Sequence, residues 1–527
     1  MLFLPAGCGV STAERSEGGA GGGGETLDDH LESGIAGLDP ATAADPESLT
    51  VLGNVGEGLY RLDENGEPVP GMAESVEVGG DRLTYTFTLR EGIEWSNGEP
   101  VTARDFEYAW LRAMHPDTAG EQVRALTDFV EGGAEYNAGE ASAGEVGVKA
   151  TGERTLEVRL KRPTPFFLDL TTLPIYLPLK ERFVAQWGEE FARSPSSLLY
   201  NGPYEMTGLD PARGMRLEKR AEYWDAANVE VETVDGRVVE SPAESYESRE
   251  LDVVVLGPGG IPEYEADEGF ELRTEFSTYA LYLNGNDPAL GNRSLRKAVQ
   301  SGFSRESFVD ALLGDGAAPA YGYVPYGMSS GGPEDETFRE LAGDTVPAAG
   351  TVDARRHWER GVNELGREPT LTILVGHGGG ERAAGDFLRD QLEERLDAEV
   401  RVEVVTPDTL LERAASGEYQ ILATRWDARY DDPASYLEPG ISGSTLTGLG
   451  LGNERYAGLV REALAEPDAG RRAAMLVRAE RLLVEEEAFV APVYHSGDSY
   501  LIAPEVRDYT THPYGLPVDY RHVEVER

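Results

Sequence analysis

Cysteine, long apolar runs and catalytic signatures are all scarce in this 527-residue sequence. Cys8 is the only cysteine, so neither an intrachain disulfide nor a thiolate metal cluster is expected. No run of about eighteen apolar residues occurs, which argues against a membrane-spanning helix. The motifs of phosphate-binding loops, serine hydrolases and zinc proteases are absent, and the seven histidines show no pair at metal-ligand spacing. We therefore expect a protein that is not an enzyme and uses no cofactor or metal.

Positive charge is scarce as well, because 47 Lys and Arg face 95 Asp and Glu, for a formal net charge of −48. Such a surface repels the nucleic acid backbone, so we expect no nucleic acid partner. We interpret the dispersed carboxylates as a solvated surface rather than a cation site. The length exceeds what one hydrophobic core supports, which indicates two or three domains.

The N-terminal residues read MLFLPAGCG, and a cysteine preceded by small residues resembles the lipobox of bacterial lipoproteins. The segment from Ser11 to Glu25 is rich in Gly, Ser and Glu and has no apolar periodicity, which is typical of a flexible tether. We expect residues 1–29 to be a truncated signal, a lipid anchor at Cys8 and a disordered linker. The membrane would then be reached through the lipid only.

The stretch from Ala73 to Arg112 contains a strand, a turn and a helix within forty residues. Leu83 to Leu89 alternate large and polar residues at the period of a half-buried strand. Asn97 and Gly98 form a tight-turn dipeptide. Thr102 stands three residues before Asp105, a variant of the capping box, and so predicts the start of a helix.

The order of motifs around this stretch resembles the extracytoplasmic solute-binding proteins of family 5, which feed ABC importers with oligopeptides and dipeptides. The matching segments extend from about Leu38 to Tyr520 and are spread over the whole chain. They include the LDP, EGL and AES motifs between Leu38 and Ser75, LREGIEWSNGEPVTARDF, NGPY (Asn201 to Tyr204), AEYWD (Ala221 to Asp225) and ESRELDVV (Glu247 to Val254).

This resemblance, together with an alternation of strands and helices after residue 277, predicts an α/β fold of the type II periplasmic-binding-protein kind. Two lobes would be joined by a hinge, with an extra α+β domain inserted. The expected ranges are 30–62, 194–276 and 490–527 for lobe I, 63–193 for the insertion and 277–489 for lobe II. The insertion is expected beside one lobe, away from the ligand. We also expect the strands of 370–405 and of 204–217 to lie in separate sheets.

The segment RWDARYDDPASYL, from Arg425 to Leu437, follows a buried strand and is the strongest candidate for ligand binding. In the family the segment is similar to W-x-A-D-Y-x-D-P, and its first Asp holds the α-ammonium of a bound peptide. Trp426 and Tyr430 match this pattern, but Arg429 occupies the position of that Asp. A guanidinium has donors only and stays charged, so it cannot accept a hydrogen bond from an ammonium.

Several alternatives remain open at this position. Asp427 takes over the ammonium, or Arg429 meets a ligand carboxylate or phosphate as a bidentate donor. Alternatively Arg429 pairs with Asp431 or Asp432 and faces solvent. Trp426 and Tyr430 either stack on the ligand or belong to the core of the lobe.

Other candidate positions come from the resemblance alone. Ala43, Ala44 and Asp45 would supply an extended backbone that pairs with a peptide as an added strand. Tyr279 would lie on the crossing between the lobes and Tyr494 on the returning segment, although ordinary packing explains both equally well.

The resemblance implies a monomeric substrate-binding lipoprotein on the outer face of the cytoplasmic membrane. It would capture an oligopeptide or peptide-like solute between its lobes and deliver it to the permease subunits of an ABC transporter. The alternatives are a non-peptide solute, such as an oligosaccharide or a metal chelate, and a role as an extracellular ligand sensor.

Overall fold

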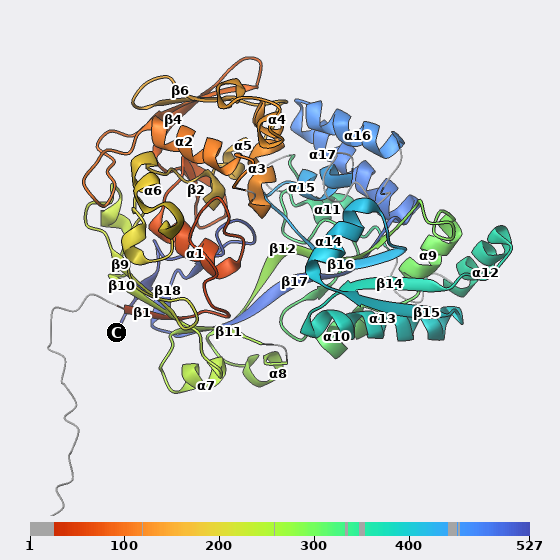
Figure 1. The fold of residues 1–527 in the computed structure, drawn as a ribbon. Coiled ribbons are helices and arrows are strands. Elements are labelled where there is room, and N and C mark those ends of the chain that lie inside the picture. The colour runs from red at the N-terminus through yellow and green to blue at the C-terminus, as the bar shows by residue number, and fades with distance from the viewer. Residues whose placement is uncertain are drawn as a thin grey trace, which may run out of the picture.

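The computed structural model describes residues 26–118, 120–257, 259–332, 336–346, 354–440, 451 and 454–527. Cys8 and the predicted tether of Ser11 to Glu25 lie outside these residues. The predicted end of the linker at residue 29 is wrong, because Thr26–His30 form strand β1 and pair with residues 233–237, so lobe I begins at residue 26. We keep the names lobe I, insertion and lobe II for the ranges predicted above. Figure 1 shows two bodies, one of which carries both ends of the described chain, with the long strands β12 and β17 running between them.

Lobe I is built on one end of the principal sheet and carries both ends of the described chain. Its strands are β1 (Thr26–His30), β8 (Tyr204–Asp210), β9 (Gly214–Lys219), β10 (Thr233–Arg237) and β11 (Val253–Leu256). Its helices are α1 (Pro46–Val55), α7 (Pro242–Glu247) and α8 (Ile261–Tyr264), and its short C-terminal strands are β18 (Val506–Arg507), β19 (Thr510–Thr511), β20 (Val518–Asp519) and β21 (Glu524–Val525).

The insertion holds a four-stranded antiparallel sheet of its own, in the order β4-β5-β7-β6. The strands are β4 (Ala73–Val78), β5 (Thr84–Leu89), β6 (Val148–Ala150) and β7 (Thr155–Arg159), preceded by the hairpin β2 (Tyr60–Leu62) and β3 (Pro68–Pro70). Its helices are α2 (Ala103–Ala113), α3 (Arg124–Thr127), α4 (Gly133–Asn137), α5 (Phe167–Leu170) and α6 (Glu181–Trp187).

Two local predictions for this region are confirmed. Strand β5 buries alternate residues, because its apolar side chains recur at the strand period. Helix α2 begins after Thr102, whose backbone N–H donates to Asp105 Oδ2 at 2.9 Å in a capping box.

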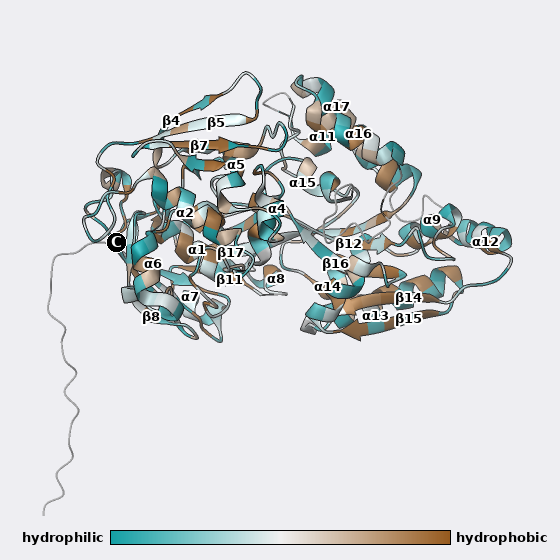
Figure 2. Cartoon of the chain, turned by 45° about the horizontal axis from the view of Figure 1, so that its top comes forward, coloured by the Kyte–Doolittle hydropathy of each residue, from teal (hydrophilic) through white to brown (hydrophobic). Residues whose placement is uncertain are grey.

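Lobe II contains three parallel strands and most of the helices of the second body. The strands are β14 (Leu371–Gly376), β15 (Val400–Val405) and β16 (Ile421–Asp427). The helices are α9 (Arg293–Ser301), α10 (Arg305–Leu312), α11 (Phe338–Ala342), α12 (Ala354–Leu365), α13 (Gly379–Leu396), α14 (Pro407–Ser416), α15 (Ala434–Leu437), α16 (Glu454–Ala465) and α17 (Ala469–Glu480). Figure 2 shows apolar residues concentrated along β14, whereas α12 is largely polar.

The two bodies share one continuous sheet, so the expectation of separate sheets is wrong. The order is β15-β14-β16-β12-β17-β11-β1-β10-β9-β8, with the short β13 (Ala318–Pro319) paired to β17. Continuity arises because β12 (Phe270–Leu283) and β17 (Val490–Ile502) are long antiparallel partners. One end of β17 pairs with β11 of lobe I, and the far end of β12 pairs with β16 of lobe II.

A bulge interrupts β12 at the middle of this crossing. Thr274 pairs with Gly497 and Thr278 pairs with His495, so three residues of β12 face one residue of β17. A bulge of this kind bends the strand and redirects side chains. Residues 275–277 therefore have no partner in the ladder with β17 at the point where the two bodies meet, although Ser277 still pairs with Asp427 of β16.

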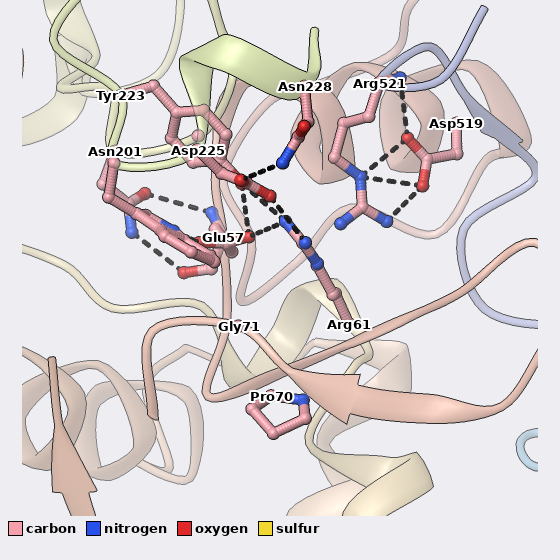
Figure 3. Close-up of polar contacts among 12 residues, drawn as sticks. Glu57, Arg61, Pro70, Gly71, Asn201, Tyr223, Asp225, Asn228, Asp519 and Arg521 are labelled. Carbon is pink, nitrogen blue, oxygen red and sulfur yellow. Dashed lines mark hydrogen bonds and ion pairs between the residues drawn. The ribbon is translucent and has the colours of Figure 1, made fainter. Parts of the chain in front are cut away.

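Several motifs that carry the family resemblance meet in a buried polar network of lobe I (Figure 3). The Glu57 carboxylate accepts hydrogen bonds from Tyr223 Oη and Trp224 Nε1, both at 2.6 Å, and from Arg61 at 3.1 Å. The Asn201 side-chain amide donates to the Glu57 backbone oxygen at 2.8 Å. Because all of these groups are satisfied internally, the EGL, NGPY and YWD motifs hold the fold together.

Candidate ligand-binding cleft

A cavity of about 560 Å³ lies where lobe I, lobe II and the insertion meet. Its volume falls within the range of about 300–1,000 Å³ that is usual for ligand sites. The walls come from distant parts of the chain. They are formed by Ala44, Pro46, Leu49, Gln122, Ala125, Leu173, Pro174, Glu275, Phe276, Ser277, Leu411, Arg425, Trp426, Asp427, Ala428, Arg429, His512, Pro513, Tyr514, Gly515 and Pro517.

The insertion contributes directly to this cavity through Gln122, Ala125, Leu173 and Pro174. The expectation that it lies away from the ligand side is therefore corrected. The reason is local, because α3 and the segment after α5 extend from the insertion over the junction of the two lobes. No periodic pattern in the sequence marks these short segments as walls of a cleft.

The three residues predicted to pair with a peptide as an added strand, Ala43 to Asp45, have different environments in the structure. Ala43 is buried, and its N–H donates to the Asp39 backbone oxygen at 2.9 Å. Asp45 caps α1, with its carboxylate accepting from the Ser48 N–H at 2.9 Å. Ala44, between them, is exposed to the cavity, and its backbone forms no hydrogen bond with the rest of the described chain. Of these three residues, Ala44 is therefore the one that presents unbonded backbone groups to the cavity.

Strand β16 offers a second set of free backbone groups. It pairs with β12 from Ile421 through Asp427, but on its other edge the ladder to β14 covers only Ile421 and Leu422. The edge from residue 423 onward thus has no ladder partner among the described strands, and Arg425 to Asp427 line the cavity. An open edge of this kind is a template for an added strand.

Asp427 is present in the cleft but already engaged. Its Oδ1 accepts from the Ser277 hydroxyl at 2.6 Å and lies 3.2 Å from the Arg425 Nε. The negative charge of Asp427 raises the pKa of the Arg425 guanidinium. The three side chains form a fixed ion pair and hydrogen bond on the lobe II wall.

Arg429 lines the same cavity without an ionic partner. Its guanidinium makes no hydrogen bond or ion pair with any described residue and lies 6.0 Å from the centre of the Trp426 ring. Its backbone N–H, by contrast, is fixed by the Ser435 hydroxyl at 2.9 Å. Burial lowers the pKa of Arg429, as expected for a cation that loses water without gaining a carboxylate.

The pairing of Arg429 with Asp431 or Asp432 is wrong. Asp431 accepts from the Ser329 N–H at 2.7 Å. Asp432 forms a bidentate pair with Arg472, at 2.6 and 2.8 Å, in the interior of lobe II. Sequence proximity favoured a local pair, but the partner of Asp432 lies 40 residues away on α17.

Tyr430 turns away from the large cavity and packs on the insertion. Its ring stacks on Phe166, with centroids 3.8 Å apart and 5° between the planes, and meets Phe129 edge-on at 6.2 Å. Close by, Arg162 of the insertion pairs with Glu438 of lobe II. We call these five residues the insertion contact. Tyr430 is a packing residue here, whereas Trp426 lines the cavity and its Nε1 is fixed by the Ser435 backbone oxygen at 2.9 Å.

Tyr279 and Tyr494 stand together but do not line this cavity. Their rings stack at 5.2 Å with 10° between the planes, across neighbouring strands β12 and β17. Phe308 stacks on both rings. The structure thus places this pair in the packing of lobe II beside the hinge strands.

Sequence reasoning missed the bulge residues Glu275, Phe276 and Ser277, which line the cavity where the ladder between β12 and β17 is interrupted. Burial raises the pKa of Glu275 to about 8, and the nearby charge of Asp498 contributes in the same direction. Glu32 has a raised pKa of about 7, for the same two reasons. No pattern of residue types marks the bulge at residues 275–277, since it depends on pairing between strands more than 200 residues apart.

Two further observations limit the chemistry. Within the described ranges, no helix is both long and apolar enough to cross a membrane. The same ranges contain no group of three or more His, Cys, Asp or Glu placed to hold a metal ion. The cleft combines apolar walls, open backbone edges and a few charged side chains, which is the composition of a binding site.

Comparison with known proteins agrees with this architecture. The model of the bacterial extracellular solute-binding proteins, family 5, matches residues 67–447. The dipeptide-binding protein DppE of Bacillus subtilis is 30% identical over 484 residues, covering 91% of this chain and 88% of DppE.

Solved structures give the same result. The substrate-binding domain of an oligopeptide ABC transporter from Bacillus anthracis superimposes with a TM-score of 0.79 at 30% identity, covering 95% of this chain and 99% of the other. OppA of Listeria monocytogenes bound to peptide gives a TM-score of 0.79 at 27% identity, covering 96% of this chain and all of the other. The predicted α/β solute-binding fold is confirmed, and the chain belongs to family 5 of the bacterial extracellular solute-binding proteins.

Proposed function

We propose that this protein captures a peptide between its two lobes and delivers it to the permease subunits of an ABC importer. The relatives that support this are named as dipeptide-binding and oligopeptide-binding proteins, and one of them was solved with a peptide bound. The observation in this chain that carries the proposal is the pair of open backbone edges, at Ala44 and along β16, that face one cavity.

An extended peptide fits these edges for a physical reason. Main-chain groups of a peptide add to an open strand whatever its side chains are, and pockets between the edges then select side chains. Trp426 supplies an apolar wall, and exposed Leu411 lies on the same cavity from α14. Closure of the lobes around the peptide would bury these groups and present the closed form to the permease.

The test combines a binding screen with a backbone substitution. Purified protein is mixed with a pool of tri- to pentapeptides, bound species are identified by mass spectrometry, and affinities are measured by calorimetry. Ala44→Pro removes one N–H donor and should weaken binding by about 3- to 10-fold, since one hydrogen bond contributes roughly 0.5–1.5 kcal/mol. Ala44→Val retains the N–H and serves as the matched control.

Membrane attachment is part of the proposal. Cys8 lies outside the described residues, and its lipobox-like context is the support for a lipid anchor on the outer face of the cytoplasmic membrane. Changing Cys8 to Ser in a full precursor should release the protein into the soluble fraction. Unchanged membrane retention would reject the anchor. We further expect a monomer, to be checked by light scattering.

A capture screen that returned oligosaccharides or metal chelates, and no peptide, would overturn the proposed ligand class. Equal peptide affinity of Ala44→Pro and Ala44→Val would show that the open edge at Ala44 is not used. The Trp426 fluorescence provides an independent signal of occupancy, because the ring lines the cavity.

A further inference from the structure

The cleft contains one cation, Arg429, whose guanidinium forms no ion pair or hydrogen bond with any described residue. Arg429 is half-buried and lines both the large cavity and a smaller adjoining one of about 30 Å³. Removing a guanidinium from water is costly unless a partner compensates it. A positive charge at a cavity wall that has no partner among the described residues is therefore in position to bind an anion from outside the chain.

The carboxylates along the same segment are all engaged elsewhere. Asp427 binds Ser277 and Arg425, and Glu438 pairs with Arg162 of the insertion. Asp431 and Asp432 are held by the groups described above. None of them can move to Arg429 without losing a contact that is already made.

From the opposite wall, two charges of the insertion act on Arg429. Asp128 attracts the guanidinium and Arg124 repels it, and neither forms an ion pair or hydrogen bond with it. The attraction by Asp128 is the larger of the two effects, and Glu438 of lobe II attracts the guanidinium as well, but none of these carboxylates is in direct contact with it among the described interactions. The adjoining small cavity, lined by Asp128, Phe129 and Ser435, leaves space beside the guanidinium.

We propose that Arg429 receives a carboxylate of the ligand, so that the preferred ligands are anionic at this end of the cleft. The inference rests on the proposed peptide-binding function and specifies its ligand class. A guanidinium presents planar, parallel N–H donors that match the two oxygens of a carboxylate, and it repels an ammonium. The carboxylate can be the α-carboxylate at the C-terminus of a peptide or an acidic group at its N-terminal end.

Four trialanine probes separate these sources. Each carries an N-acetyl or an N-succinyl group at one end and a free carboxylate or an amide at the other. The N-acetyl amide is neutral, the two probes with one carboxylate place it at opposite ends, and the fourth has both. Calorimetry at fixed salt measures all four against the native protein, Arg429→Gln and the control Arg455→Gln.

Arg455 is a suitable control because it carries the same charge on an exposed part of α16, where it lies 3.5 Å from Glu486. Its substitution changes the net charge by the same amount without touching the cleft. Any change common to both variants then reports long-range electrostatics, and a change confined to Arg429→Gln reports contact.

The native protein is expected to bind one of the two single-carboxylate probes at least tenfold more tightly than the neutral probe. Which of the two it prefers shows whether the carboxylate at Arg429 comes from the C-terminal or the N-terminal end of the peptide. Arg429→Gln should reduce the difference to about twofold, and Arg455→Gln should retain it. Arg429→Gln should also unfold at a temperature no lower than the native protein, because the guanidinium forms no ion pair or hydrogen bond with a described residue that the substitution would remove.

Two results distinguish failure of this inference from failure of the proposed function. Binding of the neutral and anionic probes with equal affinity, or an anion preference retained in Arg429→Gln, would overturn the role of Arg429 alone. Binding of none of the four probes, nor of unmodified trialanine, to the native protein or either variant would overturn peptide capture and the inference with it.

Discussion

The buried pair of Asp432 and Arg472 holds the cleft segment to α17, and its removal should be among the most damaging changes in lobe II. The two side chains are 5% and 3% exposed, and the two terminal guanidinium nitrogens of Arg472 donate to the carboxylate, at 2.6 and 2.8 Å. Asp432 also accepts from the Ala434 N–H at 2.8 Å, so its position shapes the turn into α15. Arg472→Met leaves that carboxylate buried without a counter-charge.

The expected loss is about 3–5 kcal/mol of unfolding free energy, the usual result of removing one partner of a buried pair. The neighbouring Arg471 offers a matched control on the same helix. It pairs with Glu466 at 2.9 Å, but its side chain is 67% exposed, so Arg471→Met should cost about 0–1 kcal/mol.

Urea unfolding at pH 7, followed by tryptophan fluorescence, measures both variants. With a slope of roughly 3 kcal/mol per molar, Arg472→Met should lower the midpoint of the lobe II transition by about 1 M or more. The double variant with Asp432→Asn should lose less than the sum of the two single losses, since both remove the same contact. Equal losses for Arg472→Met and Arg471→Met, or full additivity, would refute this reasoning.

Three other perturbations test different parts of the molecule. Glu57→Gln should cost on the order of 2 kcal/mol of unfolding free energy, because the Glu57 carboxylate accepts hydrogen bonds from Tyr223, Trp224 and Arg61. Urea titration measures this loss, and a loss below about 0.5 kcal/mol would contradict the prediction. Burial raises the pKa of Glu275 from 4.5 to about 8, so the folded protein keeps a proton that the unfolded chain releases, and unfolding free energy should fall as pH rises through this window. Glu275→Gln should make that decline shallower when urea midpoints at pH 5 and pH 8 are compared, and identical declines would argue against it. Arg429→Asp should bind unmodified trialanine more tightly than the native protein in calorimetry, since an acceptor replaces a repelling cation; unchanged or weaker affinity would count against this.

Local elements of the fold could be predicted from the sequence because their causes are local. The alternation before Leu89 and the cap at Thr102 specify β5 and α2 from a few neighbouring residues. The continuous sheet could not be predicted in this way, because the length of β12 depends on pairing with β17 about 220 residues later.

The candidate site likewise contains residues that a local sequence pattern identifies and residues that only the folded chain brings to the cavity. The segment after β16 was recognised by its place at the end of a buried strand, and Trp426, Asp427 and Arg429 do line the cavity. Tyr430 belongs to the same motif but stacks on Phe166, which no local pattern reveals. Glu275 lines the cavity at a bulge, and Ala44 differs from Ala43 in being exposed to the cavity with an unpaired backbone, neither of which a local pattern reveals.

The insertion contact has a consequence for how affinity is set. Residues 426–438 line the cavity near one end and pack on Phe129, Phe166 and Arg162 near the other. A motion that separates lobe II from the insertion must break this aromatic stack, which costs roughly 0.5–1.5 kcal/mol beyond the exposed apolar area. A ligand shifts the balance of open and closed forms only by its preference between them. Substitution of Phe166, which touches no part of the large cavity, would therefore change the resting population of the closed form and rescale the affinity for every ligand by the same factor, leaving their order of preference intact.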